Sequence, residues 1–477
     1  MTSLSSPPTD AAPAHPPRRP WFGAFLLRLH FYAGIVVGPF ILIAALSGAL
    51  YAIAPTIEQG VYARQLHAPV SDLQLTLGAQ VEIAEAHVGD EASLTAVRPA
   101  PERDDTTRVM FAQEGLGASE TRAIFIDPGT GAIRGDEVVY GTSGSLPLRT
   151  WLSNLHRNLN LGEPGRLYSE LAASWLGIVV LAGVGLWVIR IRSARAKKDF
   201  VRPNRRATGY RRVFSWHTSV GIWLALGALF LSATGLTWST YAGANVSSLR
   251  DALDWRTPAV ATSLAGGADD HGAHADHGSA SAAAPVDPAT FDDVLAVAQG
   301  VNVNTGLIQI TPPSEPGVAW VVQEIQRGYP TEADAVAVDG ATLAVVDRVD
   351  FAEFSLPAKL ATWGVAIHMG TMFGLANQIV MFLLALGIAT MVVLGYAMWI
   401  KRRPTRRARV GTPPRRGALD GAPWWAVTAI VTGGVALGLA FPLVGYPLAA
   451  FVIIDVIVDA VQSRRQAPRA KADEVAE

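Results

Sequence analysis

The sequence predicts an α-helical polytopic membrane protein, with a four-helix core bundle, a C-terminal helical hairpin and two small α+β domains outside the membrane. Half of the 477 residues are hydrophobic and only 17% are charged. The apolar residues gather in blocks long enough to span a bilayer, which takes about 20 residues in a helix. Two long polar segments between these blocks carry the sequence patterns of short strands and turns.

Four apolar blocks predict membrane-spanning helices, at about 31–54, 171–189, 220–241 and 376–400. A longer apolar stretch, 424–461, is interrupted by two prolines, so we expect a tight hairpin of two further spans there. Basic residues precede the first block, and the string Ala-Ile-Ala at 52–54 resembles a signal-peptide cleavage site. Pro55 follows this string and should block cleavage, so we expect the first helix to be retained.

The basic loops predict the orientation of the helices. Residues 190–212 hold ten Lys or Arg and residues 401–416 hold eight, whereas the long loops 55–170 and 242–367 are far more dilute in them. Short loops rich in Lys and Arg face the cytoplasm in membrane proteins. We therefore expect both chain termini inside and both long loops outside.

These spans divide the chain into alternating membrane and extramembrane segments. In chain order we expect a disordered cytoplasmic tail (1–24), a first span (25–54), an outer α+β domain (55–150), a second span with a preceding interfacial helix (151–190), a basic loop (191–212), a third span (213–241), a second outer α+β domain (242–360) with a histidine-rich linker (262–285), a fourth span (361–400), a basic loop (401–422), a two-helix hairpin (423–461) and a cytoplasmic tail (462–477).

Each long loop has the pattern of a small α+β domain. A helical pattern opens each one, at 76–87 and at 290–299. Strand-like runs follow, at 108–113 and 123–126 in the first loop and at 307–310, 319–325, 335–338 and 343–346 in the second. Turn sequences at 127–131 and 339–340 are typical of connections between antiparallel strands.

The first and third spans repeat in sequence. Aligned on His30 and His217, each span carries glycine four residues on and eighteen residues on, namely Gly34 and Gly48 in the first and Gly221 and Gly235 in the third. Eighteen residues make five turns of α-helix, so the far glycine returns to the face of its histidine. At about 1.5 Å per residue it lies about 27 Å away, nearly the hydrocarbon thickness.

The second and fourth spans match each other as well. Aligned on His156 and His368, both have glycine six and twenty-seven residues on and tryptophan thirty-one residues on, namely Gly162, Gly183 and Trp187, and Gly374, Gly395 and Trp399. The repeating unit is therefore one module used twice: a helix, an outer α+β domain and a second helix.

The predicted topology sorts the four histidines into two pairs. His30 and His217 lie at the cytoplasmic ends of their helices, and His156 and His368 at the outer ends of theirs. Two histidines at one depth on neighbouring helices can bind a metal from opposite sides, and bundle cores are a recurrent place for cofactors. We therefore expect both pairs to bind haem iron, one near each membrane surface.

Glycines on the histidine faces would leave room for a flat macrocycle near the backbone. The glycines assigned to this role are Gly34, Gly48, Gly221 and Gly235. Two alternatives stay open: a histidine at a helix end is commonly an interfacial residue with a satisfied hydrogen bond, and glycine in membrane helices commonly serves packing. Polar groups at membrane depth are costly and tend to be functional, which favours ligation.

Several functional classes are excluded by composition and motifs. The chain has no cysteine, which excludes disulfides, cysteine-ligated iron–sulfur clusters and the covalent attachment of c-type haem. Net charge is −1, so no global field attracts nucleic acid. The sequence contains no dinucleotide fingerprint, P-loop or nucleophile elbow, so we assign no catalytic residue and no evident site for NADPH or flavin.

The linker at 262–285 is a low-complexity segment rich in histidine and aspartate. Its histidines, His271, His274 and His277, could bind a transition metal loosely. The alternative, a solvated linker without a ligand, also fits this composition.

The chain resembles the PepSY-associated transmembrane proteins, often called iron-regulated membrane proteins, over roughly residues 25–405. The stretches "IHMGTMFGL", "GLWVIRIR", "GYAMWIKRR" and "DPGTGAI" carry the resemblance. It implies a multi-pass protein of the bacterial inner membrane, with two PepSY-like α+β domains in the periplasm. Some members of the family are similar to ferrisiderophore reductases with two b-type haems, which would make His30, His156, His217 and His368 the ligands.

Two functional hypotheses follow. In the first, the chain is a haem-dependent transmembrane ferric-chelate reductase: electrons from quinol or a separate cytoplasmic reductase enter at the inner haem, pass to the outer haem and reduce a ferric siderophore or another iron chelate. In the second, the chain is a non-catalytic adaptor or a partner in siderophore or metal uptake, and its helices only anchor the outer domains in the lipid bilayer.

Overall fold

The computed structural model describes residues 21–194, 197–264, 286–402, 414, 419, 422–454 and 457. Most of the two predicted tails, of the histidine-rich linker and of the second basic loop lies outside these residues. The chain divides into two compact units, one made of 1–42, 170–233 and 388–477 and the other of 43–169 and 234–387. Four long helices run through both units.

Among the described residues, four helices are long and apolar enough to cross a membrane, as the hydropathy pattern predicts. They are α1 (Trp21–Ala52), α6 (Glu163–Ser193), α7 (Gly209–Leu236) and α11 (Gly374–Lys401). Each begins before its apolar block, because hydropathy marks the hydrocarbon core while a helix can continue into the interface. Their packing as a four-helix bundle stays a prediction.

The C-terminal hairpin consists of two shorter apolar helices, α12 (Trp424–Ala440) and Pro442–Ile454, with Phe441 between them. The two backbones meet closely, since a Cβ on Gly438 would lie 3.0 Å from Gly445 Cα. The break therefore falls at Pro442, as predicted, whereas Pro447, the second predicted interruption, lies inside the second helix. That these two shorter helices also cross the bilayer, which would make six spans, stays a prediction.

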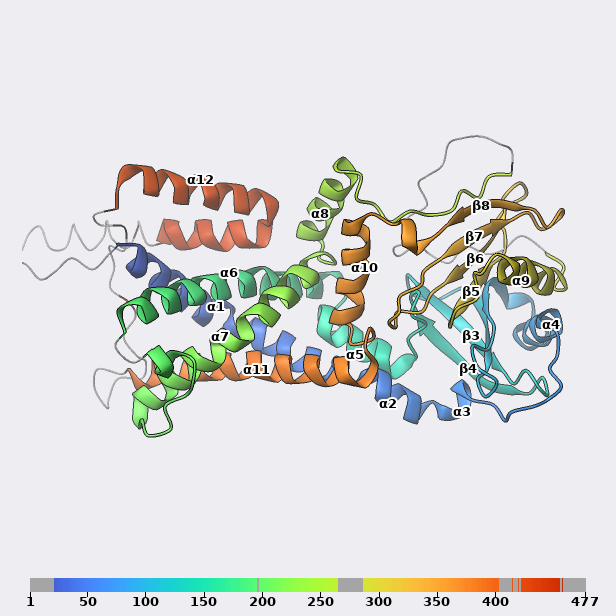
Figure 1. Ribbon diagram of the computed structural model, residues 1–477, viewed down its shortest axis with the longest axis horizontal. Coiled ribbons are helices and arrows are strands. Elements are labelled where there is room, and N and C mark those ends of the chain that lie inside the picture. The colour runs from blue at the N-terminus through green and yellow to red at the C-terminus, as the bar shows by residue number, and fades with distance from the viewer. Residues whose placement is uncertain are drawn as a thin grey trace, which may run out of the picture. The chain divides into compact units, whose positions relative to one another are not determined.

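The unit of residues 43–169 and 234–387 contains one antiparallel sheet of eight strands in the order β4-β3-β2-β1-β5-β6-β7-β8 (Figure 1). The strands are β1 (Ala92–Arg98), β2 (Thr107–Gln113), β3 (Glu120–Ile126), β4 (Ile133–Tyr140), β5 (Ile308–Thr311), β6 (Trp320–Glu324), β7 (Ala335–Val338) and β8 (Val345–Val349). Six of them lie where strands are predicted, while β1 and β4 are not predicted by the strand patterns. The predicted turns do join β3 to β4 and β7 to β8.

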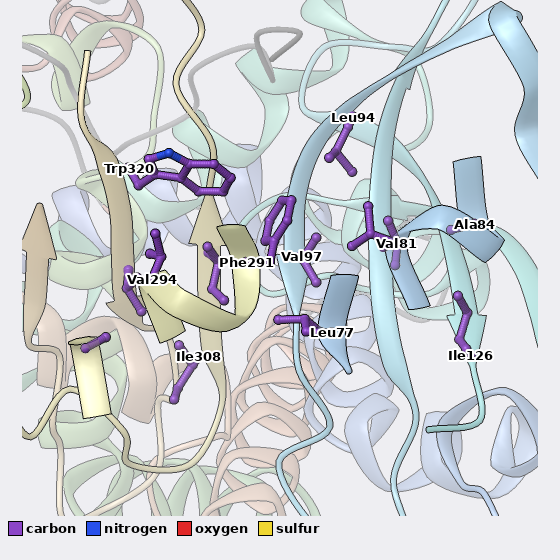
Figure 2. Packing of buried hydrophobic residues seen from close by; sticks show 14 of the residues in the cluster. Leu77, Val81, Ala84, Leu94, Val97, Ile126, Phe291, Val294, Ile308 and Trp320 are labelled. Carbon is purple, nitrogen blue, oxygen red and sulfur yellow. The ribbon is translucent and has the colours of Figure 1, made fainter. Parts of the chain in front are cut away.

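The two outer domains differ from the expectation in sharing this sheet. The strands β1–β4 come from the first long loop and β5–β8 from the second, and the pair Val97 and Ile310 joins them across β1 and β5. Both halves also bury one apolar cluster, in which Phe291 and Trp320 meet edge to face with ring centroids 4.8 Å apart (Figure 2). The repeated modules therefore form a single core instead of two.

Two helices cover one face of the sheet. They are α4 (Leu77–Val88), which contacts β1, β2 and β3, and α9 (Thr290–Gly300), which contacts β6 and β7 (Figure 1). Both are the helices predicted at the start of the long loops. They also contact each other, so the helix layer bridges the seam of the sheet.

The remaining short helices link the sheet to the long helices. They are α2 (Ala54–Val61), α3 (Ala63–Leu66), α5 (Pro147–Asn158), α8 (Tyr241–Ala252) and α10 (Leu356–His368). Leu66 of α3 and Leu146, just before α5, bury against Phe125 on the sheet face that α4 and α9 leave uncovered. This packing anchors α5, which carries His156 in its last turn.

The start of α4 is capped by a carboxylate from the other repeat. Asp292 in the first turn of α9 accepts hydrogen bonds from the backbone amides of Leu77 at 2.7 Å and Gly78 at 2.8 Å. Thr76 Oγ1 accepts from the amide of Ala79 at 3.2 Å. Three amides that a free helix end leaves without partners are thus satisfied.

Asp292→Ala is expected to loosen α4 by about 1–2 kcal/mol, because it removes an acceptor for two helix amides and a favourable charge at the helix N-terminus. Hydrogen–deuterium exchange of residues 77–88 in the full-length protein should become about 5- to 30-fold faster. Asp293→Ala is the matched control, since Asp293 lies in the same turn and is exposed. Equal exchange in the two variants would refute the capping role.

Candidate functional site

The structure brings the two inner histidines together. The rings of His30, on α1, and His217, on α7, have centroids 6.1 Å apart and planes at 74°. Two imidazole nitrogens that each bind one metal ion at about 2 Å put their ring centres about 6 Å apart. The observed separation therefore fits two imidazoles that share one metal ion, as the repeat predicts.

The helix α6 holds His30 in a defined orientation. His30 Nδ1 lies 2.8 Å from the carbonyl oxygen of Val179. Because a carbonyl only accepts, Nδ1 carries the proton and Nε2 keeps a free lone pair, which is the form that binds iron. His217 Nδ1 is buried and makes no well-aligned hydrogen bond among the described residues, although the backbone of Met391 lies beside it.

His156, near the end of α5, is held by the last turns of α1. Its Nδ1 lies 3.1 Å from Ser47 Oγ, and Ser47 donates its own hydrogen to the carbonyl of Ile43 at 2.8 Å. The serine oxygen therefore accepts from Nδ1, and Nε2 again keeps its lone pair. Tyr51 stacks parallel to the ring with centroids 6.5 Å apart, and the Tyr168 hydroxyl donates to the His156 carbonyl at 2.6 Å.

His368, the last residue of α10, has matching partners from the third span and the turn after it. Its Nδ1 lies 2.6 Å from Thr234 Oγ1, and the Trp238 ring meets it edge-on with centroids 5.9 Å apart. Burial, together with the nearby His156, lowers the pKa of His368 to about 3. Burial also lowers the pKa of His156. Both rings are therefore neutral at pH 7, as metal ligation requires.

These supporting residues were missed in the sequence, although the repeat contains the signal for them. Ser47 lies seventeen residues after His30, and Thr234 lies seventeen residues after His217. Tyr51 and Trp238 lie at the matching positions one turn later. Each repeat thus places a hydroxyl and an aromatic ring against its own outer histidine.

Two repeat glycines make room for histidine rings. A Cβ on Gly48 would lie 2.9 Å from His156 Cε1, and a Cβ on Gly183 would lie 3.0 Å from His30 Cε1. A side chain at Gly48 would therefore displace the His156 ring, and one at Gly183 would press on the His30 ring. Gly48 therefore accommodates an imidazole, whereas the sequence predicted room for a macrocycle there.

The other predicted glycines have more open surroundings. Among the described residues, no atom lies within 4 Å of a Cβ built on Gly34, and Gly221 faces Met391 Sδ at 3.6 Å. Gly235 directly follows Thr234, the hydroxyl partner of His368. Room for a macrocycle beside these glycines stays a prediction.

The remaining predicted ligands are the three histidines of the linker at 262–285. His271, His274 and His277 lie outside the described residues. Within the part of the chain that the structure describes, no group of three or more His, Asp or Glu side chains is placed to hold a metal ion. His67 and His87 each pair with a carboxylate, that of Asp105 at 2.9 Å and that of Asp136 at 3.2 Å.

Comparison with known proteins finds a family match over most of the chain. No curated protein matches the chain in sequence. The model of the PepSY-associated TM region matches residues 27–402, which include both histidine pairs, the four long helices and the sheet. The chain is therefore a membrane protein that belongs to the PepSY-associated TM region family.

Proposed function

We propose that the protein binds two b-type haem groups, one at His30 and His217 and the other at His156 and His368, and carries electrons across the bacterial inner membrane. The observation that carries the proposal is the 6.1 Å separation of the His30 and His217 rings. Two unrelated interfacial histidines would adopt this spacing only by chance.

The hydrogen bonds of the histidine rings also support metal ligation. Metal-binding histidines commonly donate their second nitrogen to a carbonyl or another oxygen, which fixes the tautomer and the ring orientation. His30 does so to the carbonyl of Val179 and His156 to Ser47 Oγ. His368 Nδ1 bonds to Thr234 Oγ1, so three of the four rings direct Nδ1 to an oxygen.

The roles of the residues follow from this arrangement. When bound, haem would supply one-electron chemistry at a potential set by its ligands and their surroundings. The His30 pair would hold one haem on the side of the electron donor, quinol or a separate cytoplasmic reductase. The His156 pair would hold the other on the side of the electron acceptor, a ferric siderophore or another ferric chelate held by the periplasmic sheet. Reduction of the iron would weaken its bonds to oxygen ligands and release it.

The absorption spectrum of the purified full-length protein tests the proposal. We expect a Soret band that shifts on reduction with dithionite, together with sharp α and β bands of low-spin iron with two imidazole ligands. Added ferric chelate should reoxidise the reduced protein. The matched control is the same preparation of the variant that lacks all four histidines, which should be colourless.

A folded, colourless wild-type protein would overturn the proposal. It would favour the alternative in which the chain is a non-catalytic adaptor or a partner in siderophore or metal uptake. A coloured protein that ferric chelates cannot reoxidise would keep the haem sites and remove the proposed substrate.

A further inference from the structure

An arginine pair occupies the centre of the sheet, next to the seam of the two repeats. Arg98 at the end of β1 stands directly opposite Arg108 on β2. Facing residues of an antiparallel pair point to the same side of the sheet, and like charges at such positions destabilise it. Arg98 is only 1% exposed, so water does little to screen the repulsion.

Arg98 is incompletely paired within the protein. Its Nε and Nη2 donate to Gln309 Oε1 at 3.0 and 2.8 Å, and Nη2 also donates to the carbonyl of Thr142 at 3.0 Å. Both acceptors are neutral. Its Nη1 is buried and has no partner among the described residues. A buried donor without an acceptor costs free energy, and more so when it is charged.

The unpartnered Nη1 of Arg98 and the Nη1 of Arg108 lie near the same glycine. A Cβ on Gly144 would collide with Arg98 Nη1 and lie 3.2 Å from Arg108 Nη1. The two Nη1 atoms therefore converge on one glycine of the loop between β4 and α5. Gly144 has a φ of +58°, which few other residues adopt.

Two further arginines adjoin this pair. Arg327, in the loop between β6 and β7, donates to Thr142 Oγ1 at 2.9 Å and lies 3.0 Å from Met369 Sδ. Met369 directly follows His368, so the cluster borders an outer histidine. Arg149 of α5 pairs with Glu58 at 3.6 Å, while its Nε is buried without a partner among the described residues.

Among the described residues, the carboxylates that act on Arg108 also have other partners. Glu58 and Asp105 are the acids that act on Arg108. Glu58 also accepts from the amide of Leu146 at 2.9 Å, and Asp105 bonds to His67. Burial, with Arg108 and Arg327 nearby, lowers the pKa of Arg98 to about 9, so the group keeps its charge at pH 7.

We propose that Arg98, Arg108 and Arg327 bind a carboxylate-bearing anion at the seam of the sheet. Guanidinium groups match the planar, two-oxygen geometry of a carboxylate, and a buried donor adds strength to the bond. The identity of this anion rests on the proposed function. The carboxylate belongs either to an anionic ferric chelate or to a propionate of the outer haem. If it belongs to a chelate, the substrates of the protein are ferric chelates that carry carboxylate groups.

Isothermal titration of the full-length protein with gallium(III) citrate, a redox-inert chelate, tests the first source. Wild-type protein should bind it, and Arg98→Gln and Arg327→Gln should each weaken binding at least about tenfold. Arg327 lies in a loop, so its variant keeps the test valid if Arg98→Gln fails to fold. Arg103→Gln is the matched control, because Arg103 is exposed and pairs with Asp72.

Haem content and potential test the second source on the same samples. If a propionate is the carboxylate, wild-type protein will not bind gallium citrate, and Arg98→Gln will shift the outer haem potential or lose that haem. If a coloured protein neither binds gallium citrate nor changes its outer haem when Arg98 is replaced, the anion site is refuted and the haem proposal stands. A colourless protein that binds gallium citrate through Arg98 and Arg327 would refute the haem proposal and leave the anion site standing.

Discussion

Replacing His30 by alanine is expected to remove about half of the bound haem while the protein stays folded. In the proposal the imidazoles of His30 and His217 hold one iron between them, and their rings lie 6.1 Å apart. A methyl group cannot bind iron. His217→Ala should give the same loss, and the double variant no further loss, because both rings serve one site. Haem per chain, measured as the pyridine haemochrome, checks this.

The outer pair should behave independently. His156→Ala is expected to remove the other half of the haem, so that its combination with His30→Ala leaves a colourless protein. The matched control is His67→Ala, since His67 has a side chain that is 45% exposed and pairs with Asp105. A further loss on adding His217→Ala to His30→Ala would contradict the pairing of these two residues.

The long helices could be predicted from the sequence because their signal is local. A run of about 20 apolar residues has few other structures available to it in a bilayer. The helix ends were less predictable, since α6 starts at Glu163, well before its apolar block. The hairpin break at Phe441 was predictable from Pro442, but the length of its helices was not.

The joining of the two outer domains could not be predicted. The pair of Val97 and Ile310 connects residues far apart in the chain, and no local pattern specifies such a pairing. The strand β4 contains Gly135, Asp136 and Glu137, which are poor strand formers. This segment is therefore extended because it pairs with β3, and its own sequence does not predict a strand. Each half-sheet alone would expose the unpaired backbone groups of its edge strand, β1 or β5, and pairing β1 with β5 satisfies them.

The histidine pairs of the candidate site could be predicted because the two repeats, aligned with each other, place histidines at matching positions. The same comparison contained Ser47 and Thr234, which bond to His156 and His368. A hydroxyl group in a helix ordinarily bonds to the backbone of that helix, so its presence in the sequence does not indicate a contact with a histidine. The contact of Gly183 with His30 depends on how α1 meets α6. Sequence spacing within one helix cannot predict contacts between two helices.

Gly48→Val is expected to abolish the outer haem site and leave the inner one intact. A Cβ on Gly48 would lie 2.9 Å from His156 Cε1 and 3.3 Å from its Nδ1. Valine adds two methyl groups to that Cβ, and its χ1 angle is stiff in a helix, so the ring must leave its position. The displaced ring loses the bond to Ser47 that orients it. A redox titration followed by absorption should change from two components to one.

Gly48→Ala is a milder form of the same change and should weaken haem binding at the outer site by about 10- to 100-fold, the effect typical of groups that orient metal ligands. The matched control is Gly433→Val in α12, where no atom of the described residues lies within 4 Å of the new Cβ. It places the same β-branched residue in an apolar helix without touching a histidine. If Gly48→Val kept both redox components at unchanged potentials, the position of the His156 ring would not matter to any haem, and its contact with α1 would be packing alone.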